Sequence, residues 1–143
     1  MRLVRVGRDL WEVLAFCDPR GRCQVLEFLT AFNSSSRAAT HGMLALLTQI
    51  VPSAGPPQGE PLSKSFGGGI YELRKQPKGK KLRVLWFYGG TRLIVCTYAF
   101  EKAERTPQLL VERSRLLRRQ FLAARSRGEV EVTDFEEGTW SPG

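Results

Sequence analysis

The residues best suited to chemistry are cations and aromatic side chains in the middle of the chain. Gly89-Gly90, between two apolar stretches, predicts a two-residue hairpin turn, because glycine takes the positive φ values that such turns need. That turn would place Arg83 opposite Cys96, and side-chain alternation would put Arg83 and Tyr98 on one sheet face, about 7–8 Å apart. Arginine, lysine and tyrosine together suit phosphodiester chemistry, in which the main task is to stabilise charge on phosphate.

Further cations flank this predicted sheet face. Arg74 lies in the preceding strand, where Glu72 shares its face and could pair with it, and Lys102 follows the last strand. Strand ends and connections add the candidate RNA-binding residues Lys75, Lys78, Lys80, Lys81 and Arg105. Such a patch neutralises phosphates, and tyrosine can stack on an unpaired base. The sequence shows no carboxylate pair and no nucleophile beside a histidine, so the familiar acid–base routes of hydrolysis are disfavoured.

The composition also favours a polyanionic partner. A chain of 143 residues is the size of one domain, and a net charge of +8 with a pI near 9.9 makes nucleic acid the leading partner. Residues 129–143 carry five acidic side chains and no basic one. We therefore expect a single domain over 1–128 and an acidic C-terminal tail over 129–143, free in solvent rather than folded back on the basic surface.

Neither a metal nor a cofactor is expected. Cys17, Cys23 and Cys96 lack the spacing of a zinc site or a disulfide framework, and His41 is the single histidine. The chain lacks an apolar run near the roughly 18 residues that a membrane span needs. These observations predict a reduced, cytoplasmic protein without a membrane partner.

The elements that must position these residues can be placed from turn formers and hydrophobic spacing. A strand is expected over Trp11–Phe16, then a helix over Gln24–Phe32 and a second one capped by Ser34–Ser36 and ended by Pro52. A loop over Pro52–Lys64 and a hinge at Gly67–Gly69 lead to strands Ile70–Lys75, Leu82–Tyr88 and Leu93–Phe100. The order β-α-α-β-β-β-α predicts an α+β fold: a small antiparallel sheet with two N-terminal helices and a C-terminal helix.

The expected C-terminal helix has Thr106 as its N-cap and Pro107 at its first position, and it runs to about Arg127. Its apolar arc includes Leu109 and Leu116, and Arg113 falls in the middle of that arc. We expect Arg113 to extend its guanidinium to the edge of the core.

Several of these segments resemble the RelE/ParE superfamily of bacterial toxins. The resemblance is carried by Tyr71–Arg74, Leu82–Tyr88, Tyr98–Phe100, Lys102, and Thr106-Pro107 opening an arginine-rich helix. The chain is most similar to the phage-derived HigB-like branch. The resemblance implies a RelE-like fold and the toxin of a type II toxin–antitoxin system, a ribosome-dependent mRNA endonuclease or mRNA interferase. Its implied partners are the ribosome, mRNA and a helix-turn-helix, HigA-like antitoxin.

The same resemblance implies roles for single residues. Arg74 and Arg83 would bind or stabilise the transferring phosphate, and Lys102 would assist, while the 2′-hydroxyl of the substrate attacks. Tyr98 stands near a position where similar proteins often have histidine, and it would carry a proton or serve as a stacking platform. Ala103 and Glu104 depart from the usual basic run, which implies weaker catalysis.

Two alternatives to the nuclease stay open. One is a ParE-like toxin that acts by binding DNA gyrase without catalysis, and the other is a degenerate basic RNA-binding module. Only the nuclease leaves new 5′ ends inside reading frames.

Overall fold

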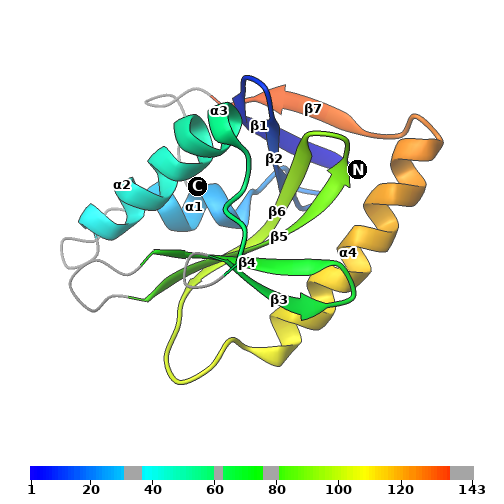
Figure 1. Cartoon of the computed structure of the whole chain (residues 1–143). Helices are drawn as coiled ribbons and strands as arrows, with labels where there is room; N and C mark the ends of the chain where they lie inside the picture. Colours follow the sequence, from blue (N-terminus) through cyan, green and yellow to red (C-terminus); the bar gives the residue numbers. More distant parts are fainter. Residues whose placement is uncertain (31–36, 60–62, 76–80, 136–143) are drawn as a thin grey trace.

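A computed structural model gives the architecture in Figure 1 and describes residues 1–30, 37–59, 63–75 and 81–135. A seven-stranded sheet in the order β3-β4-β5-β6-β2-β1-β7 forms its centre. The strands are β1 Arg2–Arg8, β2 Glu12–Cys17, β3 Ser63–Gly67, β4 Ile70–Lys75, β5 Leu82–Gly90, β6 Leu93–Glu101 and β7 Glu131–Asp134. The expected α+β class is confirmed. The sheet is larger than predicted, and it is mixed, because β2 pairs with β6 and β1 with β7 in parallel.

Helices cover both faces of the sheet (Figure 1). They are α1 Gln24–Thr30, α2 Arg37–Ala45, the π-helical turn η1 Leu46–Ile50, α3 Val51–Ala54 and α4 Gln108–Ser126. α1 and the continuous α2–η1–α3 segment pack on one face and α4 on the other, so that two apolar cores flank the sheet. None of the helices in the described ranges combines the length and apolar content that a membrane crossing requires.

The observed element order differs from the prediction at three strands and one helix end. β1, β3 and β7 were not expected, because β1 and β3 interleave charged or small side chains with apolar ones and β7 is acidic. Pro52 does not end the second helix: it lies at the first turn of α3, where its missing N–H is not needed, directly after the wide turn of η1. The predicted cap at Ser34–Ser36 lies outside the described residues.

The predicted turn at Gly89-Gly90 is wrong. Both glycines belong to β5, and the chain turns at Thr91 and Arg92, where Arg92 takes a positive φ of 53°. A Cβ on Gly89 would lie 2.8 Å from the ring of Phe121 on α4, so glycine is needed there for close helix packing rather than for a turn.

The corrected turn changes the register of the β5–β6 hairpin. Arg83 pairs with Phe100, and Trp86 pairs with Cys96. Arg83 therefore does not stand opposite Cys96: Cys96 packs in the core beneath α1 and α2, where burial raises the pKa of its thiol to about 12. A register shift between Leu85 and Trp86 leaves one extra residue on β6.

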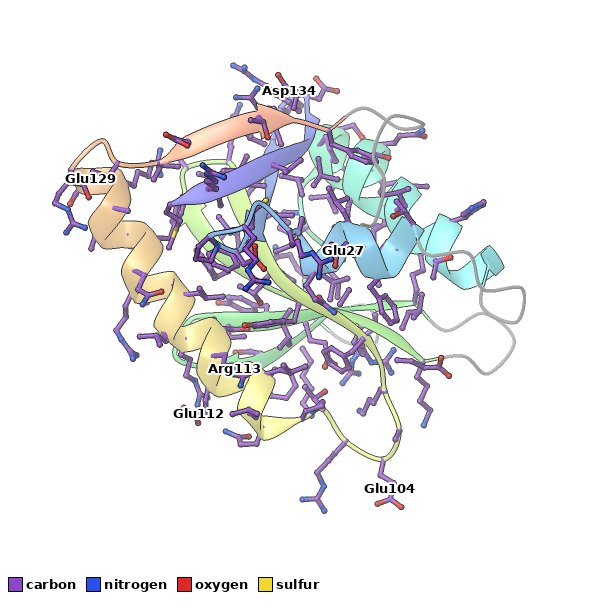
Figure 2. All side chains as sticks on the ribbon, turned by 180° about the vertical axis from the view of Figure 1, so that it is seen from behind. Glu27, Glu104, Glu112, Arg113, Glu129 and Asp134 are labelled. Carbon is purple, nitrogen blue, oxygen red and sulfur yellow. The ribbon has the colours of Figure 1, made fainter. Side chains whose placement is uncertain are left out.

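α4 is rotated relative to the predicted orientation. Its buried face consists of Val111, Ser114, Leu117, Phe121 and Ala124, whereas Leu109, Leu116 and Arg113 are exposed. Figure 2 labels Arg113 and Glu112 near the start of this helix. The rotation brings three arginines over glycines of the β3–β4 turn and of β5, since added Cβ atoms on Gly68, Gly69 and Gly90 would meet Arg115, Arg118 and Arg125 respectively.

The first half of the acidic segment is not free in solvent. β7 pairs in parallel with β1, and the side chain of Arg5 donates to Asp134 at 2.6 Å. The Met1 ammonium also donates to the carbonyl of Glu129 at 2.9 Å. The expectation of a free tail is therefore wrong for Glu131–Asp134, and residues 136–143 lie outside the described ranges.

Packing of β1 on η1 and α3 leads to a test of the fold. An added Cβ on Gly7 would lie 2.6 Å from Pro52 Cγ and 2.8 Å from the carbonyl oxygen of Leu47. We expect Gly7→Ala to lower the free energy of unfolding by about 1–3 kcal/mol, because the neighbouring backbone must shift. The matched control is Gly42→Ala in α2, where nothing lies within 4 Å of the new methyl group. Alanine there should stabilise the helix by up to about 1 kcal/mol. Urea unfolding of both variants checks the prediction, and equal stabilities would contradict it.

Candidate functional site

The site is organised around the carboxylate of Glu72 on β4, which is fully buried. Arg74 Nε donates to its Oε1 at 3.2 Å, and Arg83 Nε on β5 lies 3.4 Å from the same oxygen. The hydroxyl of Thr106, just before α4, donates to Oε2. The register places Arg74 directly opposite Arg83, so a single carboxylate holds two neighbouring guanidinium groups and ties β4, β5 and the start of α4 together.

Lys102 and Lys64 complete a group of cations around this carboxylate. Burial lowers the pKa of the Lys102 amine, and the charge of Glu72 partly opposes that shift. The charges of Arg83, Arg74 and Lys64 lower the pKa of Lys102 further. We call these five residues the Glu72 cluster. With four cations and one carboxylate it has an excess of positive charge, and it is suited to bind an anion such as phosphate.

The structure thus brings together three of the predicted catalytic residues, Arg74, Arg83 and Lys102. Their exposure differs from the prediction, because Arg83 is only 3% exposed and does not stand on an open sheet face. Burial also lowers the pKa of Arg83, while Glu72 opposes the shift. Removal of Arg83 would leave a buried carboxylate with fewer partners, so this arginine supports the fold as well as any function.

Tyr98 lies on β6, two residues before Phe100, the residue that pairs with Arg83. It lines a cavity of about 280 Å³ with Phe16, Asp18, Arg22, Gln24, Glu27 and Thr97, and none of the residues of the Glu72 cluster lines that cavity. The predicted pairing of Arg83 with Cys96 was wrong, but Tyr98 remains a diagonal neighbour of Arg83 on the same sheet face, because Arg83 pairs with Phe100 and Leu85 with Tyr98.

The predicted RNA-binding residues extend the positive charge outward. Lys81 is exposed, and its carbonyl accepts a hydrogen bond from the Lys102 backbone N–H at 2.7 Å. Arg105 is exposed in the connection to α4, and Lys75 is half-buried at the end of β4. Lys78 and Lys80 lie outside the described residues. Lys81 and Arg105 therefore give the Glu72 cluster an exposed basic rim, whereas Lys75 lines a cavity beside η1 and α3.

Sequence reasoning missed two members of the site. Lys64 fell at the end of a predicted loop, whereas it is part of β3 and pairs with Glu72. Thr106 was expected to cap α4, but Pro107 occupies that position and the Thr106 hydroxyl binds Glu72 instead. The sequence signal for the central carboxylate was the spacing of Glu72 and Arg74, which stand two residues apart on one strand face. Within the described ranges, no group of three or more His, Cys, Asp or Glu side chains is placed to hold a metal ion.

Comparison with known proteins adds a family to this geometry. A family model described as "Phage derived protein Gp49-like (DUF891)" matches residues 27–115, which is more than half of the chain. The matched range contains every residue of the Glu72 cluster, and it leaves out β1, β2 and β7. No curated protein matches the chain.

The buried carboxylate leads to a prediction about stability. Glu72→Gln keeps the size of the side chain but removes its charge, which leaves Arg83 buried without its counterion. We expect the free energy of unfolding to fall by about 3–5 kcal/mol, the usual cost of breaking a buried ion pair from one side. Glu104→Gln is the matched control, because Glu104 is exposed and should change stability by less than about 0.5 kcal/mol. Urea unfolding measures both, and a loss at Glu72 no larger than at Glu104 would contradict the central role of this carboxylate.

Proposed function

Because the chain belongs to the Gp49-like family of phage-derived proteins, which is associated with RelE-like toxins, we propose that it is the toxin of a type II toxin–antitoxin system. We assign it to the HigB-like branch of the RelE/ParE superfamily and propose that it cleaves mRNA on the ribosome. The observation that carries this proposal is the Glu72 cluster, in which two arginines contact one buried carboxylate and two lysines lie around it. Stabilisation of charge on a reacting phosphate requires such a fixed group of donors.

The exposure of each cation suggests its role. Lys102 and Arg74 are partly exposed and would contact the phosphate. Arg83 is buried, so it would attract the phosphate electrostatically from behind while it binds Glu72. In the proposed reaction the 2′-hydroxyl of the message loses its proton to water as it attacks the adjacent phosphorus, and the bond to the 5′ oxygen of the next nucleotide breaks to leave a 2′,3′-cyclic phosphate. That oxygen needs a proton as it leaves. Lys102 suits this task, because its lowered pKa makes it a better proton donor than an ordinary lysine.

The partners follow from the same proposal. A cytoplasmic toxin of this kind meets the ribosome and its message, and a helix-turn-helix antitoxin holds it inactive. The basic rim formed by Lys81 and Arg105 is a surface that an acidic antitoxin segment would cover. We expect the product of a neighbouring reading frame to copurify with the chain and to restore growth on coexpression. Failure of every neighbouring product to bind or to rescue growth would count against the toxin assignment.

The catalytic role of Lys102 can be tested directly. We expect Lys102→Ala to slow cleavage of ribosome-bound message by roughly 10²–10³, the usual loss for one well-placed stabilising group. Stability should stay within about 0.5 kcal/mol of the parent, since the amine is partly exposed. The control is Arg8→Ala, which removes an exposed cation from β1, three places from β5 in the strand order. New 5′ ends mapped after brief expression give the rate of cleavage.

Each outcome selects one of the candidate functions. A folded Lys102→Ala protein that cuts as fast as the parent would overturn the assignment of this lysine. A parent that stops growth without new 5′ ends would favour the gyrase-binding alternative. A parent that neither stops growth nor cuts RNA would favour a degenerate RNA-binding module.

A further inference from the structure

The cavity around Tyr98 lies where β2 separates from β6. The two strands pair only from Glu12 opposite Leu93 to Ala15 opposite Cys96. Farther along β6, the side-chain amide of Gln24 replaces the missing strand, because it donates to the carbonyl of Ala99 at 2.7 Å and accepts from its N–H at 2.8 Å. The edge of β6 is thus hydrogen-bonded on either side of an opening that no strand fills.

The extra residue on β6 shapes this opening. Since the register shift lies between the pairs of Cys96 and Tyr98, the consecutive residues Thr97 and Tyr98 both line the cavity. The Thr97 hydroxyl is already engaged with the carbonyl of Leu85 and the hydroxyl of Ser114. A bulge of this kind re-aims a side chain, and here it adds an aromatic ring to the wall of the cavity.

The walls of the cavity combine two rings with one arginine, Arg22, and two carboxylates, Asp18 and Glu27. Phe16 and Tyr98 are half-buried, and Glu27 on α1 lies beside the turn that follows β2 (Figure 2). Arg22 Nε is 3.9 Å from Glu27 Oε1, and the Arg22 side chain is 56% exposed. Asp18 accepts from the backbone N–H groups of Arg20 and Arg22 and so fixes the turn that carries Arg22. An ion pair this long contributes little to stability.

We propose that this cavity binds a guanine base of the RNA substrate, an inference that rests on the proposed function. Aromatic side chains stack on the face of any base, and a carboxylate beside a guanidinium selects among base edges. Guanine offers two adjacent N–H donors that match the Glu27 carboxylate, and its O6 and N7 acceptors match an arginine. Adenine, cytosine and uracil lack that pair of adjacent donors.

The position of the cavity along β6 suits a substrate that also reaches the Glu72 cluster. Tyr98 and Lys102 are separated by four residues of nearly extended chain, or about 13 Å at about 3.3 Å per residue. A short stretch of single-stranded RNA can therefore place a phosphate at Lys102 and a base beside Tyr98. The cavity would then select the sequence that is cut, and the Glu72 cluster would act on the backbone.

Binding of single nucleotides to the whole chain tests this proposal without requiring cleavage. We would titrate the protein separately with the 5′-monophosphates of guanosine, adenosine, cytidine and uridine, and follow backbone amide signals by NMR. The shared phosphate cancels between the four ligands. We expect guanosine monophosphate to bind most tightly and to shift the amides of Phe16, Glu27 and Tyr98.

Two variants and a control make the test specific. Glu27→Gln replaces an acceptor by a donor, and it should weaken guanosine monophosphate about tenfold or more while uridine monophosphate stays unchanged. Arg22→Gln, at an exposed position, should also weaken guanosine monophosphate. Glu104→Gln removes an acidic group from the connection before α4 and should change neither affinity (Figure 2).

The results separate this proposal from the proposed function. Equal binding of the four nucleotides, or a guanosine preference that survives both Glu27→Gln and Arg22→Gln, would overturn the guanine site. Cleavage of message by a protein without that preference would leave the nuclease standing. Guanosine binding by a protein that leaves no new 5′ ends would instead overturn the nuclease and keep the base-binding cavity.

Discussion

The shared carboxylate of Glu72 is the constraint on which the basic site depends. Arg74 and Arg83 stand directly opposite each other on adjacent strands, where two like charges would repel. A carboxylate between them removes that repulsion, and the guanidinium groups in turn make its burial tolerable, since an unpaired buried charge is very costly. The hydroxyl of Thr106 adds the start of α4 to the same carboxylate. The donors are therefore held in place before any ligand arrives, which is the condition for electrostatic stabilisation of a reacting phosphate.

The two faces of the central sheet carry different kinds of side chain. Beneath α1 and α2 the strands present an apolar and aromatic layer, in which Tyr71 stacks on Trp86 with their ring centroids 4.8 Å apart. Beneath α4 the same strands present Glu72 and Arg83, and the hydroxyls of Thr97 and Ser114 meet at 2.6 Å. Alternation along each strand keeps the layers separate, so Glu72 and Arg83 share the α4 face with a smaller apolar core, while the other face supplies most of the buried apolar residues.

Local sequence patterns sufficed for the parts of the molecule that local physics determines. The strands β4, β5 and β6 were predicted to within two residues at each end, and Arg74, Arg83 and Lys102 do converge. The failures involve distant partners. Gly89 is glycine because Phe121 of α4 lies against it, and β7 is a strand because its backbone pairs with β1. Neither cause can be seen in the residues next to Gly89 or β7. The misplaced turn gave the wrong register for the β5–β6 hairpin, so that Arg83 was paired with Cys96 instead of Phe100.

Pairing of β7 with β1 joins segments from opposite ends of the sequence. Arg2 lies opposite Glu131, so this edge of the sheet cannot close until residues 131–134 have been synthesised. Before that point β1 presents an open row of backbone donors and acceptors, the feature through which sheets add foreign strands. β7 then makes the finished edge of the sheet acidic, because the side chains of Glu131 and Asp134 are exposed there. A growing chain is thus most prone to pair its open β1 edge with another chain just before synthesis reaches β7. Once β7 has formed, it covers that edge.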